Sequence, residues 1–425
     1  MYEKIEHDRT EFQRDYDRLI FSSPFRRLQN KTQVFPLPDS IFVHNRLTHS
    51  LEVASVGRSL GNDVAKVLLR RSPELKESNI QEIGAVVSAA CLAHDMGNPP
   101  FGHSGEKAIA TYFSEGDGGR YRSLLTDEQW SDFVHFDGNA NTFRLLTHQF
   151  KGRRKGGFVM TYSTLASIVK YPFSSMDAGK KQKFGFFTTE KEGFTRVADE
   201  LGLIARPRMS AYPHYCRHPL VYLVEAADDI CYEVMDIEDA HKLRLLTTEE
   251  THRLLLAFFD EERQNHIRDI LSHVSDVNEQ VVYLRSCVIG LLVHECTDVF
   301  VKNEMRILGG CFEGSLLDHV NERVHAAYRD CVDVSVKRIY HCKEVVDIEV
   351  GGFKLIYTLI DLFTSAAMSP DKAYSRLLLN RVSEQYEIHA ENIHTRLMSV
   401  LDYISGMTDV YAVDLYKKIN GEILH

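Results

Sequence analysis

Apolar residues recur at spacings of three and four over long stretches of this 425-residue chain, and this spacing limits the possible folds more than any other feature. It is the period of an α-helix that buries one face. The pattern runs through residues 51–69, 80–96, 220–240, 281–300 and 374–404. Alternating runs are few, and the best strand candidates are 345–350, ahead of Gly351-Gly352, and 183–189. The sequence therefore predicts a mainly α fold with few short strands.

Between about Lys151 and Arg217 the helical pattern gives way to sequence rich in Gly, Lys and Ser. We expect long loops inserted in a helical body here. The basic runs at 151–157 and 180–183 are typical of a solvated, mobile loop. The alternative is that they contact a triphosphate group or a nucleic acid.

Charge and cysteine usage exclude several classes of protein. A net charge of −10 argues against a general nucleic-acid binder, which needs a basic face, although it does not exclude a local basic patch. The eight cysteines are scattered, form no Cys-x-x-Cys motif, and suggest reduced thiols in the core. Residues 1–18 are densely charged, unlike a signal peptide, and no apolar run approaches 18 residues. We therefore expect a cytoplasmic protein that makes no membrane contact.

Three separate segments carry residues that could bind a metal. His94-Asp95 ends an apolar helix predicted over 83–96, ahead of Gly97-Asn98-Pro99-Pro100. His49 opens the helix that runs to Leu69. Such a His-Asp pair occurs by chance in a chain with 20 His, and a lone His at a helix start is more often a surface residue.

The third segment is the helix predicted over 220–240, which is apolar on most sides but carries one acidic stripe. Its members are Glu225, Asp228, Tyr232, Asp236 and Asp239. A solvated face is one explanation, but buried carboxylates need a partner or a metal. Two His and two carboxylates suit Mn, Fe, Co or Ni, or Mg with retained waters, and spacing does not choose among them.

The order of His49, His94-Asp95 and an Asp at 228 or 229 resembles the signature of the HD phosphohydrolase superfamily. Longer stretches resemble its deoxyguanosine triphosphate triphosphohydrolase (dGTPase) branch, at 15–29, 31–35, 46–50, 94–103, 136–140, 225–230 and 405–409. They follow the family's order along nearly the whole chain, which speaks against coincidence.

The resemblance implies roles for individual residues. The implied metal ligands are His49, His94, Asp95 and Asp228; Asp228 is preferred to Asp229 because a Tyr and an Asp follow it by four and eight residues. The implied acid–base pair is His103 and Glu106. The implied substrate-binding residues are Gln33, Arg46, Asn139, Lys183, Tyr232 and Asp236, with Lys170 as a further cation near the triphosphate.

On this basis we expect an HD-domain helical core over 1–240, with the loop insertion at about 151–217. A helical carboxy-terminal region over 241–425 is expected to pack on that core and to contribute to a homo-oligomer, such as a hexamer. The expected reaction is metal-dependent hydrolysis of a deoxynucleoside triphosphate, dGTP in the first place, to deoxynucleoside and triphosphate. The alternatives are an HD-type nucleotidase or phosphodiesterase with another substrate, and a nucleotide-sensing regulator that binds single-stranded nucleic acid. A nucleotide effector is a further expected partner.

Overall fold

The fold is seen in a computed structural model that describes residues 9–35, 43–153, 156–206 and 212–422. Its first half contains α1 (Glu11–Ile20), α2 (Ser23–Arg27), α3 (Arg46–Arg71), α4 (Ile83–Ala93), α5 (His103–Ser114), α6 (Asp127–Val134), α7 (Gly138–Thr147), α8 (Tyr162–Ile168), α9 (Lys191–Glu200) and α10 (Val221–Lys242). Its second half contains α11 (Thr248–Leu256), α12 (Glu261–Ser272), α13 (Val277–Lys302), α14 (Glu304–Leu308), α15 (Glu322–Val334), α16 (Lys343–Met368), α17 (Ala373–Leu379), α18 (Ile393–Ser405) and α19 (Asp409–Ile419). The mainly α class is confirmed.

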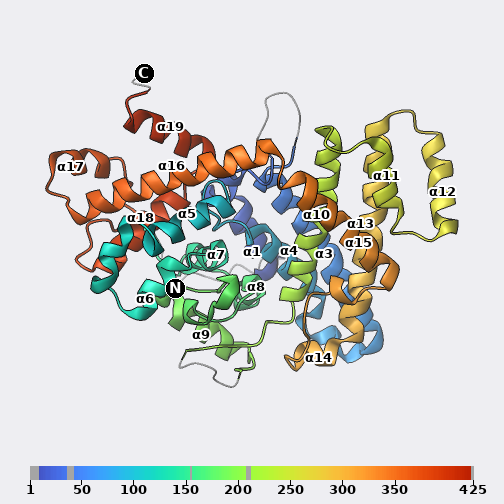
Figure 1. Cartoon of the computed structure of the whole chain (residues 1–425). Helices are drawn as coiled ribbons and strands as arrows, with labels where there is room; N and C mark the ends of the chain where they lie inside the picture. The colour runs from blue at the N-terminus through green and yellow to red at the C-terminus, as the bar shows by residue number, and fades with distance from the viewer. Residues whose placement is uncertain (1–8, 36–42, 154–155, 207–211, 423–425) are drawn as a thin grey trace.

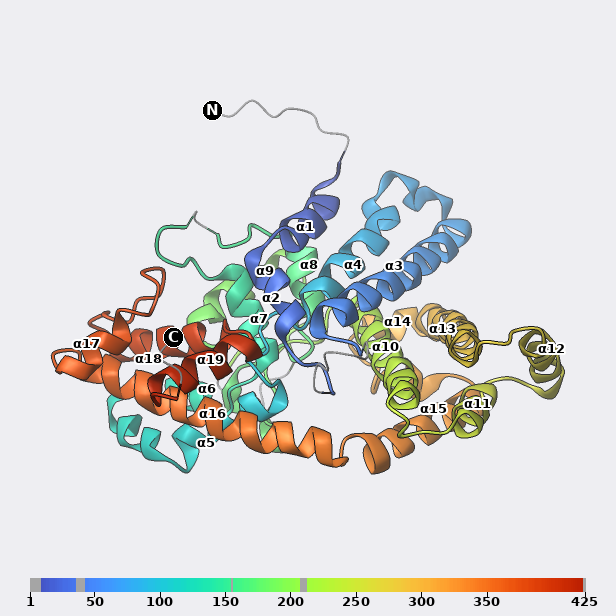
Figure 2. The same cartoon turned by 90° about the horizontal axis from the view of Figure 1, so that it is seen from above.

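Two groups of buried apolar side chains form the interior. One is built around α3, α4, α10 and α13, and the other joins α5 and α6 to α16 and α18. The long helix α16 lies beside α5 and reaches across the molecule, while α11 and α12 project at the far end (Figures 1 and 2). Both groups draw side chains from before and after residue 240. The division of the chain at that residue stays a prediction.

The strand predictions are wrong. Residues 345–350 belong to the helix α16, and 183–189 form an irregular segment with one bridge, Ser174 to Phe186, before a 3-10 turn. Among the described residues β-pairing is limited to isolated bridges. Val345 packs into the core while Val350 is exposed, so burial of one helical face outweighs the β-propensity of valine.

Two further boundaries differ from the prediction. The helix expected over 374–404 is split into α17 and α18, because the Asn392 side chain accepts a hydrogen bond from Thr395 N and starts a new helix. The region expected as loops, 151–217, contains α8 and α9, and Phe184, Phe186 and Phe187 in it are fully buried. Arg154 and Lys155 of its basic run lie outside the described residues.

The helices that carry the predicted site follow the expected pattern more closely. The helices α3, α4, α10 and α13 cover the predicted ranges to within a few residues. His94 is the C-cap of α4, ahead of the predicted turn. Within the described residues, no helix combines the length and the apolar character needed to span a bilayer.

Candidate metal centre and active-site cleft

Three helices bring their polar residues to one point. The helix α3 carries His49, α4 ends at His94, and α10 carries Asp228. His49 Nε2 lies 3.1 Å and His94 Nε2 lies 3.4 Å from the same atom, Asp228 Oδ1. The potential ligand atoms of these three residues all lie within 4.8 Å of one another. The fold therefore brings together residues that are 179 positions apart in the sequence.

The surroundings of His94 leave its Nε2 atom directed at this centre. Its Nδ1 donates a hydrogen bond to the backbone oxygen of Cys91, 2.6 Å away, which sets the ring orientation as is common for metal-binding histidines. Burial lowers the pKa of His94, but the carboxylates of Asp95 and Asp228 outweigh burial and raise that pKa to about 9. Two imidazole nitrogens facing a carboxylate oxygen form a donor set that fits a divalent cation.

Asp95 lies beside this group, with both carboxylate oxygens already engaged. Oδ2 accepts a hydrogen bond from Arg46 at 2.6 Å and Oδ1 accepts one from the Asn98 side chain at 2.6 Å. His94 Nε2 is 3.6 Å from Asp95 Oδ1. A carboxylate has about four lone-pair sites, so these two bonds leave capacity for a metal ion.

A cleft of about 660 Å³ opens over this centre. The predicted residues that line it are Gln33, Arg46, His94, Asp95, His103, Glu106, Asn139, Lys183, Asp228 and Tyr232. His49 and Asp236 are not among its lining residues and are buried. Two buried polar atoms of lining residues, Gln33 Oε1 and Arg46 Nε, have no hydrogen-bond partner within the described part of the chain. Such atoms fit a polar ligand.

The pair of His103 and Glu106 stands at the start of α5, on one edge of the cleft. His103 Nδ1 lies 2.8 Å from Glu106 Oε2. Burial of Glu106 raises its pKa, but hydrogen bonds from His103 and Gly138 N and the charge of Lys183 lower that pKa to about 2. The buried carboxylate is therefore ionised, while the His103 side chain is 74% exposed and faces solvent.

The turn that leads into α5 brings this pair close to Arg46. Phe101 and Gly102 both adopt positive φ angles, 61° and 54°. A Cβ atom at Gly102 would collide with the Arg46 guanidinium, so the close approach requires glycine.

Two cations and an asparagine also line the cleft. Lys183 Nζ lies 3.2 Å from Glu106 Oε2 and 3.3 Å from Asp137 Oδ1. Asn139 donates from its side chain to Asp137 Oδ1 at 2.9 Å. Lys170 also lines the cleft, and its ammonium is paired with Glu225 at 2.9 Å.

Tyr232 lies one helical turn after Asp228 on α10, and its ring centroid is 6.3 Å from that of His49. Asp236, a further turn along, accepts a hydrogen bond from Tyr340 at 2.7 Å. Burial raises the pKa of Asp236 well above its usual value. Tyr340 itself lines the cleft, 6.0 Å from the ring of Tyr232.

Comparisons with known proteins identify the family. The HD domain matches residues 46–201 and the phosphohydrolase-associated domain matches 319–418. A deoxyguanosinetriphosphate triphosphohydrolase-like protein of Synechocystis is 38% identical over 99% of this chain and 96% of its own. One from Pseudomonas aeruginosa is 36% identical over 97% and 94%. The chain belongs to the deoxyguanosinetriphosphate triphosphohydrolase-like family of HD-domain phosphohydrolases. A Yersinia enterocolitica protein named deoxyguanosinetriphosphate triphosphohydrolase is 28% identical over 96% of this chain.

Two residues at the cleft of this dGTPase-like protein, Tyr340 and Asp137, were not predicted from the sequence. Tyr340 lies in the phosphohydrolase-associated domain, in a stretch where no motif suggested a role. Its contact with Asp236 joins α10 to the π-helical turn at Ser335–Ile339, more than 100 residues later. Asp137 stood inside a quoted family motif, and its buried carboxylate could have been recognised as a partner for Lys183. For Tyr340 the sequence offered no comparable signal.

Proposed function

We propose that the chain hydrolyses deoxynucleoside triphosphates, dGTP in the first place, to the deoxynucleoside and inorganic triphosphate. The observation that carries this proposal is the convergence of His49, His94 and Asp228 next to a cleft. The lining of that cleft also contains an ionised carboxylate–imidazole pair and several cations. The names of the relatives point to the same substrate.

In this proposal His49, His94, Asp95 and Asp228 hold a divalent cation, which is Mn, Mg, Co, Fe or Ni. The bound cation supplies positive charge that stabilises the charge developing on the α-phosphate. Arg46 adds a second positive charge directed into the cleft, and its unpartnered Nε is free to bind a phosphate oxygen. Lys183 would neutralise the outer phosphates.

His103 would act as the general base. Glu106 engages Nδ1 of its ring, which leaves Nε2 to take the proton from the attacking water. The water oxygen forms a bond to the α-phosphorus, the bond from that phosphorus to the 5′-oxygen breaks, and the 5′-oxygen takes up a proton. The products are a free deoxynucleoside and an intact triphosphate.

Tyr232 and Tyr340 would enclose the deoxyribose, with Asp236 behind them and Gln33 toward the sugar 3′ side. The Tyr232 and Tyr340 rings, with centroids 6.0 Å apart, would exclude an added 2′-hydroxyl group from the sugar face that they cover. Asn139 would contact the substrate from α7. These roles predict discrimination against ribonucleotides.

The test is an incubation of metal-loaded protein with each deoxy- and ribonucleoside triphosphate, followed by anion-exchange separation of the products. We expect deoxyguanosine and triphosphate from dGTP, with GTP left intact. Release of orthophosphate or pyrophosphate would contradict attack at the α-phosphorus. Equal cleavage of all four deoxynucleotides would retain the reaction and remove the base preference.

A further inference from the structure

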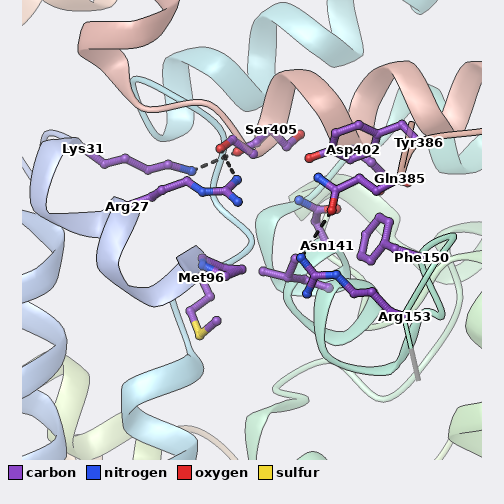
Figure 3. Close-up of a pocket in the computed structure, with 13 residues that line it drawn as sticks. Arg27, Lys31, Met96, Asn141, Phe150, Arg153, Gln385, Tyr386, Asp402 and Ser405 are labelled. Atoms are coloured by element: carbon purple, nitrogen blue, oxygen red, sulfur yellow. Dashed lines mark hydrogen bonds between the residues drawn. The ribbon is translucent and has the colours of Figure 1, made fainter. Parts of the chain in front are cut away.

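A second cavity, of about 40 Å³, lies next to the catalytic cleft and is lined by different residues. Lys31 and Arg27 extend into it from one side, toward Ser405, while Arg153, Gln385 and Phe150 face them (Figure 3). Met96 lines this cavity, whereas its neighbours Asp95 and Asn98 line the cleft. The segment from Asp95 to Asn98 therefore lies between the cavity and the cleft.

The lining of the cavity is positively charged, although the chain carries a net charge of −10. Three cations line it: Arg27, Lys31 and Arg153. Its one lining carboxylate, Asp402, accepts two hydrogen bonds from Arg144, at 2.8 and 2.7 Å. Arg144 also pairs with Glu190, so this buried cluster carries one net negative charge against the three lining cations. The unbalanced charge favours an anionic occupant.

The cavity also contains hydrogen-bond donors that have no acceptor among the described residues. Ser405 is 3% exposed, and its hydroxyl has no hydrogen-bond partner among the described residues. The Lys31 ammonium, 2% exposed, donates to two backbone oxygens, of Asn98 at 2.5 Å and of Ser405 at 2.9 Å, which leaves one of its three donors. Burial lowers the pKa of Lys31 to about 7. An anion would restore the stability of its charged form.

The volume limits the size of the occupant. A water molecule needs about 10–15 Å³ measured in this way, so the cavity holds a few water-sized groups. That is enough for a single phosphoryl group but not for a base and a sugar. Arg153 at the exposed side could contact further phosphates outside the cavity.

Lys31 connects the cavity to the metal centre. Its ammonium donates to the backbone oxygen of Asn98, whose side chain donates to the Asp95 carboxylate at 2.6 Å. The backbone oxygen of Lys31 accepts a hydrogen bond from Arg46 N at 3.2 Å. An anion that draws the ammonium toward itself would loosen its bond to Asn98, and hence alter how Asp95 is held.

We propose that the cavity lined by Arg27, Lys31, Arg153 and Ser405 is a regulatory site for a phosphoryl oxyanion, and that its occupancy is relayed to Asp95 through Lys31 and Asn98. The oxyanion is either free phosphate or polyphosphate, or the terminal phosphate of a nucleotide. The binding step does not depend on the reaction proposed above, whereas the relay rests on it.

The test compares wild type with Arg153→Gln and Ser405→Ala, using isothermal titration calorimetry with inorganic phosphate and then with tripolyphosphate. Arg268→Gln, an exposed arginine on α12, is the matched control. Loss of a charge-assisted hydrogen bond should weaken binding by roughly tenfold in Arg153→Gln. Ser405→Ala removes a hydroxyl that has no partner, so it should fold normally and also bind less tightly. Binding equal to wild type in both variants would overturn the site.

The second arm measures the steady-state rate of metal-loaded protein at increasing phosphate concentration. We expect a change in kcat in wild type and in Arg268→Gln at the same phosphate concentration, and in Arg153→Gln only at a roughly tenfold higher concentration. Purely competitive inhibition, identical in all three proteins, would overturn the relay. Calorimetry measures binding without turnover. The binding site is therefore tested even if the protein does not catalyse the proposed reaction. The affinity lost in Arg153→Gln distinguishes the two sources: a larger loss for a nucleoside triphosphate than for tripolyphosphate would identify a nucleotide, and an equal loss would identify a free oxyanion.

Discussion

His103 and Glu106 differ sharply in their surroundings although they form one hydrogen-bonded pair. Glu106 is buried, ionised, and bound by the backbone N–H of Gly138 at 2.7 Å. His103 leaves 74% of its side chain exposed. A fixed carboxylate that orients an accessible imidazole is suited to proton transfer, because only the imidazole needs to reach the substrate and its water.

His103→Ala is therefore expected to lower kcat by about 10²–10⁴-fold, the usual contribution of a general base, without loss of metal. The exposed side chain contributes little to folding, so the melting temperature should not change. His94→Ala, by contrast, should lose metal and activity together, because His94 Nε2 faces Asp228. Metal content by mass spectrometry and steady-state rates distinguish the two variants. Full turnover by His103→Ala would contradict its role as the base.

At the scale of elements, the packing of α16 against the turn before α5 controls where His103 lies. Ser104 donates a hydrogen bond from its hydroxyl to the backbone oxygen of Glu349 at 2.5 Å. Gly352 faces Phe101 so closely that a Cβ atom would come within 2.5 Å of the ring. The neighbouring Gly351 has open space around it. The two glycines thus have different roles, although both were expected to follow a strand.

Gly351→Ala should stabilise the protein by about 0.5–1 kcal/mol, because alanine favours an exposed helix interior. Gly352→Ala should destabilise it and lower kcat, because the added methyl group displaces Phe101 and with it the His103 turn. Thermal unfolding and steady-state kinetics of both variants provide the comparison. Equal effects of the two substitutions would show that α16 does not pack on this turn in solution.

At the scale of the whole molecule, one buried ion cluster joins regions far apart in the chain. Arg144 on α7 binds Asp402 on α18 and Glu190 beside α9, each at 2.7 Å. All three side chains are nearly inaccessible. The cluster links the residues matched by the HD domain to the phosphohydrolase-associated domain, 258 positions later.

Arg144→Met should lower the free energy of unfolding by about 3–5 kcal/mol, because it leaves two carboxylates buried without their cation. Arg120→Met removes an exposed arginine 3.6 Å from Asp361 and should cost about 0–1 kcal/mol. Urea unfolding of both variants measures the difference. A similar small effect for Arg144→Met would mean that the cluster does not hold the two regions together.

Helical periodicity was sufficient to predict the class and the positions of α3, α4, α10 and α13, because burying one face of a helix leaves a repeat that is local in sequence. The quoted motifs led to the family and to several of the residues that line the cleft. The sequence did not indicate that 345–350 is helical, that Tyr340 contacts Asp236, or that Lys31 joins two cavities. These features depend on contacts between residues 67 to 374 positions apart in the sequence, which leave no local pattern. The predicted homo-oligomer, the effector and the choice of metal stay predictions, since each depends on a molecule or ion outside this chain.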